Sequence, residues 1–146
     1  MNDTAAARPI NYQREIPDVL QAMGSVHRAM DGYGLERGLH HLVQLRASQI
    51  NRCDYCIKLH TREALEDGET GTRLERLADW SQAADFSARE CAALAWTEAL
   101  TRLEPGAELG PLRARLREHF SDNEIGVLTS SVAMINLWNR IQVSRH

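Results

Sequence analysis

The chain has no excess of basic residues and few aromatic ones. It carries 17 Lys and Arg residues against 20 Asp and Glu residues, for a formal net charge of −3, and aromatic side chains make up 5% of it. Nucleic-acid-binding domains usually carry a basic patch, and single-strand binders often stack bases on aromatic rings. The composition therefore argues against nucleic acid as a partner.

Long hydrophobic runs are also missing. No apolar stretch approaches the roughly 20 residues that a helix needs to cross a bilayer, so no membrane partner is expected. The beginning, "MNDTAAARPINYQRE", lacks the charged start and apolar centre of a secretory signal peptide. We therefore expect a cytoplasmic protein, in which thiols are kept reduced. Because the cysteines number three, a framework of structural disulfides is not expected.

What the sequence does contain is apolar residues at helical spacing, with helix-start signals and no sustained strand alternation. "SARE" (87–90) and "SDNE" (121–124) are capping boxes, in which a serine and a glutamate cap the first turn of a helix. We expect a flexible tail over residues 1–13 and one all-α domain over 14–146, with six or seven helices. The expected helices cover about 17–30, 35–50, 51–66, 72–80 and 111–119, with one more after each capping box.

The stretch "NRCDYCIKLH" (51–60) concentrates the reactive side chains. With Asn51 as the expected N-cap, Cys53 falls in the first turn, where the helix dipole favours a thiolate. Cys56 lies three residues after Cys53, and His60 four residues after Cys56, so all three side chains share one stripe of the helix. A dithiol needs this arrangement: two sulfurs close enough to bridge, and a base beside them.

Three interpretations of this stretch are open. The thiols can form a redox pair, in which an attacked peroxide leaves a sulfenic acid that the second thiol converts to a disulfide. They can ligate zinc together with His60 and a fourth ligand from His40 or His41. They can also be inert core residues, as we expect for Cys91. Structural zinc usually uses two separate ligand pairs, and a second pair is absent. The spacing therefore favours the redox pair.

The residues around this stretch resemble a known family. Segments 42–69, 73–101 and 120–143, with S-Q-I-N before Cys-x-x-Cys-x-x-x-His, are similar to the AhpD-like alkylhydroperoxidase branch of the carboxymuconolactone decarboxylase family. The resemblance implies an all-α subunit assembling into trimers or hexamers. It also implies a thiol-dependent peroxidase or disulfide reductase with no metal or organic cofactor. The substrate would be a hydroperoxide, and the reductant a dithiol donor such as a lipoylated or thioredoxin-like protein.

The resemblance also implies a role for each residue of the motif. Cys56 would meet the peroxide, Cys53 would resolve the intermediate, and His60 would belong to a proton relay. The family pattern has a glutamate twelve residues before the first cysteine, where this chain has His41. The carboxylate of the relay is therefore expected to be missing or replaced by an imidazole, which leaves a redox sensor or disulfide reductase with weak peroxidase activity as the alternative. Arg52 stands where family members commonly have glycine.

Two smaller expectations concern the rest of the chain. His27 is expected at the surface. Asn136 and Asn139 lie in a helix with an apolar face, where a buried amide needs a hydrogen-bond partner. We expect that partner across a subunit interface.

Overall fold

The computed structural model of the protein describes residues 3–146, and within this range it is all-helical. None of the helices in this range is both long and apolar enough to cross a membrane. The helices are α1 (Asp3–Ala6), α2 (Tyr12–Glu15), α3 (Pro17–Asp31), α4 (Arg37–Ile50), α5 (Asp54–Glu66), α6 (Gly71–Glu75), the 3₁₀-helix η1 (Leu77–Gln82), α7 (Ala88–Arg102), α8 (Leu109–Arg117) and α9 (Asp122–Val143).

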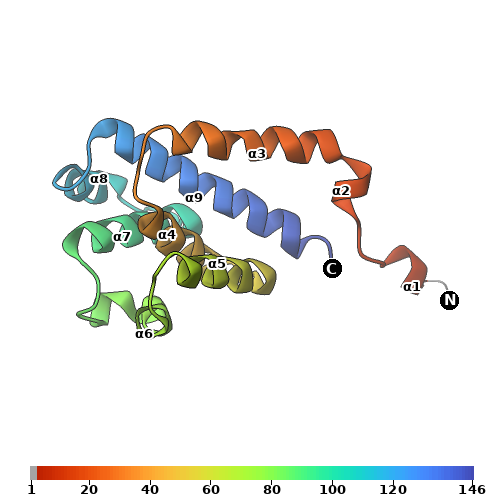
Figure 1. The fold of residues 1–146 in the computed structure, drawn as a ribbon, viewed down its shortest axis with the longest axis horizontal. Helices are drawn as coiled ribbons and strands as arrows, with labels where there is room; N and C mark the ends of the chain where they lie inside the picture. Colours follow the sequence, from red (N-terminus) through yellow and green to blue (C-terminus); the bar gives the residue numbers. More distant parts are fainter. Residues whose placement is uncertain (1–2) are drawn as a thin grey trace.

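Helix α4 lies in the middle of the bundle and packs against α5, α7 and α9 (Figure 1). Its apolar residues serve two core clusters. Leu39 and Val43 pack with residues of α7, α8 and α9, whereas Leu42 and Leu45 pack with residues of α5, η1 and α7. Because both sides of α4 are buried, the position of its C-terminal end is fixed, and the cysteine stretch begins at that end.

The sequence predicts the long helices well. Both capping boxes are confirmed, with the serine and glutamate side chains bonded reciprocally to the backbone at Ser87–Glu90 and at Ser121–Glu124. The helix expected over 72–80 is instead two elements, α6 and η1, and non-helical backbone at Asp79 interrupts the second. The all-α prediction is confirmed for the described residues, and the short elements α1, α2 and η1 add to the expected number of helices.

The N-terminal segment reaches away from the bundle (Figure 1). Short helices α1 and α2 form along it, and Ile10 N–H donates to the carbonyl of Arg145 at 3.2 Å. Helix α3 then runs beside α9, but Met30 is its only buried residue. The division into a flexible tail over 1–13 and a domain over 14–146 stays a prediction, and residues 1 and 2 lie outside the described range.

Candidate active site

A tight turn between α4 and α5 places the cysteine pair. Asn51 ends α4, and Arg52 adopts a left-handed backbone with φ of 54°. Cys53, with extended backbone, is the N-cap of α5, and its Sγ accepts a hydrogen bond from the Cys56 N–H at 3.4 Å. The predicted N-cap at Asn51 is therefore wrong. Arg52 separates the two helices, and the Cys53 sulfur caps α5. The free backbone N–H groups of the first turn of α5 favour negative charge at this position.

Both cysteines are free of any disulfide in the structure and buried, each with 2% of its surface exposed. The Cys53 N–H donates to the carbonyl of Ser48 at 3.1 Å, which ties the turn to the end of α4. Burial raises the pKa of the Cys56 thiol to about 12, since a thiolate is poorly solvated there, and the adjacent Cys53 adds to the rise. The Cys56 thiol is therefore protonated in the resting protein and needs local groups that accept its proton or stabilise its anion.

His60 lies on the same helix but is hydrogen-bonded to a carboxylate rather than to a cysteine. Its Nδ1 is 3.1 Å from Oε2 of Glu63. Because an ionised carboxylate only accepts, Nδ1 carries the proton and Nε2 is left as a free acceptor. Burial lowers the pKa of His60, and Glu63 opposes this shift without reversing it. His60 is therefore a neutral imidazole that can take up a proton.

His41 is buried at 6% exposure and has a carboxylate partner of its own. Its Nε2 lies 2.6 Å from Oδ2 of Asp67, the residue that ends α5, and Arg37 contacts the same oxygen at 2.9 Å. The hydrogen bond from His41 lowers the pKa of Asp67, and the charge of Arg37 adds to the effect. Position 41 thus carries an imidazole, and Asp67, at the far end of the cysteine helix, places a carboxylate beside it.

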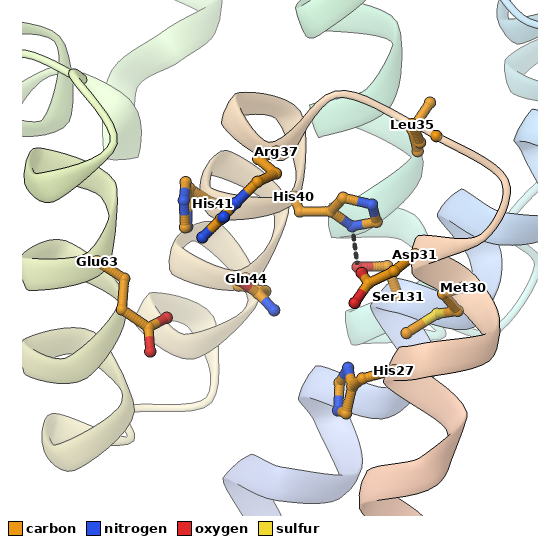
Figure 2. Close-up of a pocket in the computed structure, with 11 residues that line it drawn as sticks. His27, Met30, Asp31, Leu35, Arg37, His40, His41, Gln44, Glu63 and Ser131 are labelled. Atoms are coloured by element: carbon orange, nitrogen blue, oxygen red, sulfur yellow. Dashed lines mark hydrogen bonds between the residues drawn. The ribbon is translucent and has the colours of Figure 1, made fainter.

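A cavity of about 510 Å³ opens between α3, α4, α5 and α9. Figure 2 shows Glu63 reaching from α5 toward α4, while His40 points to Ser131 and is bonded to it at 3.1 Å. His27 lines the cavity too and accepts a hydrogen bond from the Trp138 indole at 2.8 Å. His27 is therefore half-buried, in the wall of a cavity that opens at the surface. Neither cysteine lines the cavity, but Glu63 belongs both to its wall and to the His60 pair.

The amides predicted to need a partner find one within the chain. Asn51 Nδ2 donates to Oδ1 of Asn136 and of Asn139, at 2.9 Å in each case, and Asn139 Nδ2 donates to Ser48 Oγ at 3.0 Å. Asn139 is 1% exposed. The expectation of a partner across a subunit interface is therefore corrected. The amides connect α9 to the turn that carries the cysteines.

Comparison with known proteins assigns the family. The model of the carboxymuconolactone decarboxylase family matches residues 17–99. The chain belongs to this family. Protein YdfG of Bacillus subtilis (strain 168), itself uncharacterized, is 30% identical over 135 residues, which are 92% of each chain.

Solved structures place the chain on the AhpD-like branch of the carboxymuconolactone decarboxylase family. A protein of unknown function from Agrobacterium tumefaciens, provisionally named an antioxidant defence protein AhpD, is 34% identical with a TM-score of 0.88 and covers 94% of each chain. An uncharacterized peroxidase-related protein from Ralstonia eutropha JMP134, described as an alkylhydroperoxidase AhpD core, has a TM-score of 0.76 at 23% identity. That match covers 88% of this chain and 69% of the other, and it supports the fold alone.

The cysteine motif does not lie in a set of ligands that could bind zinc. Among the side chains that the structure describes, in residues 5–146, no three His, Cys, Asp or Glu lie close enough together to hold a metal ion. The two histidines considered as a fourth ligand are engaged elsewhere, His40 with Ser131 and His41 with Asp67.

Sequence reasoning missed two acids of the site, for different reasons. Glu63 lies three residues after His60, which is a contact spacing on a helix, so the sequence held the signal. Asp67 lies 26 residues from His41, and only the packing of α4 against α5 brings the two together. No pattern in a single sequence predicts the contact between His41 and Asp67.

Proposed function

We propose that this member of the carboxymuconolactone decarboxylase family is a thiol-dependent peroxidase of the AhpD type. It would reduce hydroperoxides through Cys53 and Cys56 and be recycled by a dithiol donor. The strongest support is the arrangement at the start of α5. Two free thiols lie one helical turn apart, joined by the Cys56 N–H to Cys53 Sγ contact, and a neutral imidazole lies on the next turn at His60.

The first step is attack on the peroxide by Cys56. His60 Nε2 accepts the thiol proton, and the thiolate bonds to the terminal oxygen of ROOH as the O–O bond breaks. The sulfur is oxidised to a sulfenic acid, and the alkoxide that leaves takes the proton back from His60 to become ROH. Glu63 stabilises the His60 imidazolium between the two proton transfers, because its carboxylate accepts the hydrogen bond from Nδ1.

The second step forms the disulfide. The Cys53 sulfur attacks the Cys56 sulfenic sulfur, and hydroxide leaves with the Cys53 proton as water. A dithiol donor then reduces the disulfide by exchange through a mixed disulfide and is itself oxidised. A lipoylated or thioredoxin-like protein fits this chemistry, because its second thiol releases the mixed disulfide.

His41 forms the outer end of the proton relay in this proposal. Its charge lowers the pKa of His60, so protonation of one imidazole disfavours protonation of the other. Asp67 holds the Nε2 of His41 and takes the place of the carboxylate that the family pattern carries at position 41. The cavity beside Glu63 is the proposed approach for the peroxide, since Glu63 both lines it and holds the His60 imidazole.

A second candidate function has a specific observation in its favour. Both cysteines are 2% exposed, and burial raises the pKa of the Cys56 thiol to about 12, so attack on a peroxide would be slow in the resting conformation. A redox sensor or a disulfide reductase tolerates slow peroxide attack, whereas an antioxidant peroxidase needs fast turnover. The rate of turnover therefore separates the two candidates.

We also propose assembly into a trimer or hexamer. A folded monomer of this mass exposes about 7,500 Å², and the chain exposes 8951 Å². Apolar side chains contribute to the surplus, among them Val19 and Val26 on α3 and Tyr55 and Leu65 on α5. An interface between copies would cover such residues.

The experiment that tests the proposed function is a hydroperoxide-consumption assay coupled in turn to dihydrolipoamide and to thioredoxin. The wild type is expected to turn over with at least one donor, and Cys56→Ser to lose nearly all activity. Cys53→Ser should not complete the proposed catalytic cycle, because the sulfenic acid on Cys56 then lacks the second thiol that converts it to a disulfide. Cys91→Ser is the matched control and should retain activity, since Cys91 bonds only to the Phe86 carbonyl.

Two outcomes would count against this assignment. Peroxide consumption by Cys56→Ser at the wild-type rate would show that Cys56 is not the attacking residue. Peroxide oxidation of the wild type without turnover by either donor would favour the sensor. Restoring the family's acid at position 41 is informative only as the double variant His41→Glu, Asp67→Asn, because His41→Glu alone would place two carboxylates side by side.

A further inference from the structure

A second cavity, of about 470 Å³, lies where the N-terminal segment meets the end of α9. Its walls come from α2, from the start of α3, from the last turns of α9 and from the residues that follow α9 (Figure 1). The volume falls in the range of small-molecule sites. It shares no lining residue with the cavity beside Glu63, so the two are separate sites.

Arg145 lines this cavity with an incompletely paired guanidinium. Its Nε is buried without a hydrogen-bond partner, and its Nη1 donates to Gln142 Oε1 at 3.5 Å, the outer limit of a hydrogen bond. None of the ion pairs among the side chains of residues 5–146 includes Arg145. A guanidinium has five N–H donors, and a charge drawn out of water is unfavourable unless it is paired. An anion in the cavity would supply the acceptors.

The polar groups around Arg145 do not compete with an anion. Among the described residues that line the cavity, none is Asp or Glu, and Arg145 is the one with a charge. Because a guanidinium only donates, Gln142 turns its amide oxygen toward Arg145 and keeps its NH₂ group for another acceptor. Arg145 and Gln142 thus present N–H groups together, three residues apart at the end of the chain.

Apolar surface forms much of the remaining wall. Trp138 donates its indole N–H to His27 Nε2 at 2.8 Å, and the two rings are stacked. The indole nitrogen is the one polar atom of that side chain, so Trp138 offers the cavity ring surface alone. Leu20, Ile141 and Pro17 add aliphatic surface. Apolar walls with a few convergent polar groups are typical of sites for small organic molecules.

We propose that this cavity binds a small organic acid, whose carboxylate pairs with Arg145 and whose apolar body packs against Trp138 and Leu20. A planar guanidinium matches a carboxylate through two parallel N–H···O bonds. A single cation suits one carboxylate better than a doubly charged phosphate. Because α2, α3 and α9 all contribute to the cavity, the bound acid should also raise the midpoint of thermal unfolding. The proposal does not depend on the proposed peroxidase function.

The test uses phenylacetate as the probe and isothermal titration calorimetry on the whole chain. Phenylacetate should bind saturably, and 2-phenylethanol, of similar size but without charge, should bind about tenfold more weakly or worse. Arg145→Gln should weaken phenylacetate binding by about tenfold or more. Arg115→Gln removes the same charge from an exposed position on α8. It is the matched control, and its affinity should stay within about twofold of the wild type.

Three outcomes overturn the proposal. The first is a wild type that does not bind phenylacetate saturably, and the second is an unchanged affinity in Arg145→Gln that circular dichroism shows to be folded. The third is displacement of phenylacetate by inorganic phosphate at the same concentration, which would contradict the preference for a carboxylate. If no probe binds and sedimentation velocity shows that Arg145→Gln alters the assembly, the partner of Arg145 is a carboxylate of another copy and not a small acid.

Discussion

Arg52 occupies a backbone conformation that most side chains avoid. Its φ of 54° lies in the left-handed region, where a Cβ crowds the neighbouring carbonyl and costs about 1–2 kcal/mol. The glycine that the family commonly carries at this position has no such cost. The position thus serves the geometry of the turn, and the exposed arginine is not required for it.

We expect Arg52→Gly to stabilise the protein relative to Arg52→Ala by about 1 kcal/mol, because alanine keeps the strain and glycine relieves it. Both variants remove the same charge, so the comparison isolates the backbone. Urea unfolding of the two proteins provides the measurement. Equal midpoints would show that the turn is not strained at this residue.

Two half-buried histidines, His40 and His60, should make the stability depend on pH. Burial lowers the pKa of His40 and of His60 below the ordinary value of 6.5. The unfolded chain therefore binds these protons first as the pH falls. Their contribution to stability is complete above about pH 6.5 and is lost progressively below it.

Unfolding free energy should accordingly fall between about pH 6.5 and pH 5, and His40→Gln and His60→Gln should each flatten that fall. His146→Gln, which alters an exposed histidine, should leave it unchanged. Urea titrations at a series of pH values test this. A slope as steep in His60→Gln as in the wild type would mean that folding does not lower the pKa of His60.

At the scale of elements, one buried ion pair joins α4, η1 and α7. Arg46 Nε donates to Glu98 Oε1 at 2.7 Å, and the Trp80 indole donates to the same oxygen at 2.9 Å. Burial alone would raise the pKa of Glu98, but these hydrogen bonds hold it below its usual range. The carboxylate is therefore charged and connects three elements at one point.

Glu98→Ala should cost about 3 kcal/mol, because Arg46 is left as a buried charge without its partner. Glu104→Ala, which removes an exposed acid just past the end of α7, is the control and should change little. Thermal and urea unfolding of both variants measure this change in the free energy of unfolding. A loss below about 1 kcal/mol for Glu98→Ala would indicate that water replaces the carboxylate at Arg46.

The elements also show what the sequence can and cannot predict. Capping boxes and apolar periodicity are local, so Ser87 and Ser121 marked their helices correctly. The rule that asparagine caps helices predicted that Asn51 begins α5, but Cys53 caps it. Arg52, in the left-handed region, separates the two helices. No sequence rule predicts that backbone conformation for an arginine. The contact between His41 and Asp67 depends on how two helices pack, and only the folded chain reveals it.

At the scale of the whole molecule, the proposed assembly would cover apolar side chains that helix α3 leaves exposed. Helix α3 buries a single residue and carries Val19 and Val26 at 43% and 38% exposure. If copies assemble through this helix, charges at these positions should weaken the assembly. The family resemblance predicted a trimer or hexamer from the sequence. Only the structure identifies exposed residues that could form the interface.

We expect the double variant Val19→Asp, Val26→Asp to shift the protein toward smaller species, because burying two carboxylates in an interface is unfavourable. Ser25→Asp places a charge on the same helix at a polar position and is the control. Sedimentation velocity at several concentrations gives the distribution of species. An unchanged distribution in the folded double variant would place the interface elsewhere.

The central claim is that Cys53 and Cys56 act as one redox pair. Its most direct test is a peptide map of the wild-type protein after treatment with one equivalent of hydroperoxide. The map should show a Cys53–Cys56 disulfide, Cys91 unmodified, and full reversal by a dithiol. Cysteines that remain reduced while peroxide is consumed, or oxidation confined to Cys91, would contradict the account.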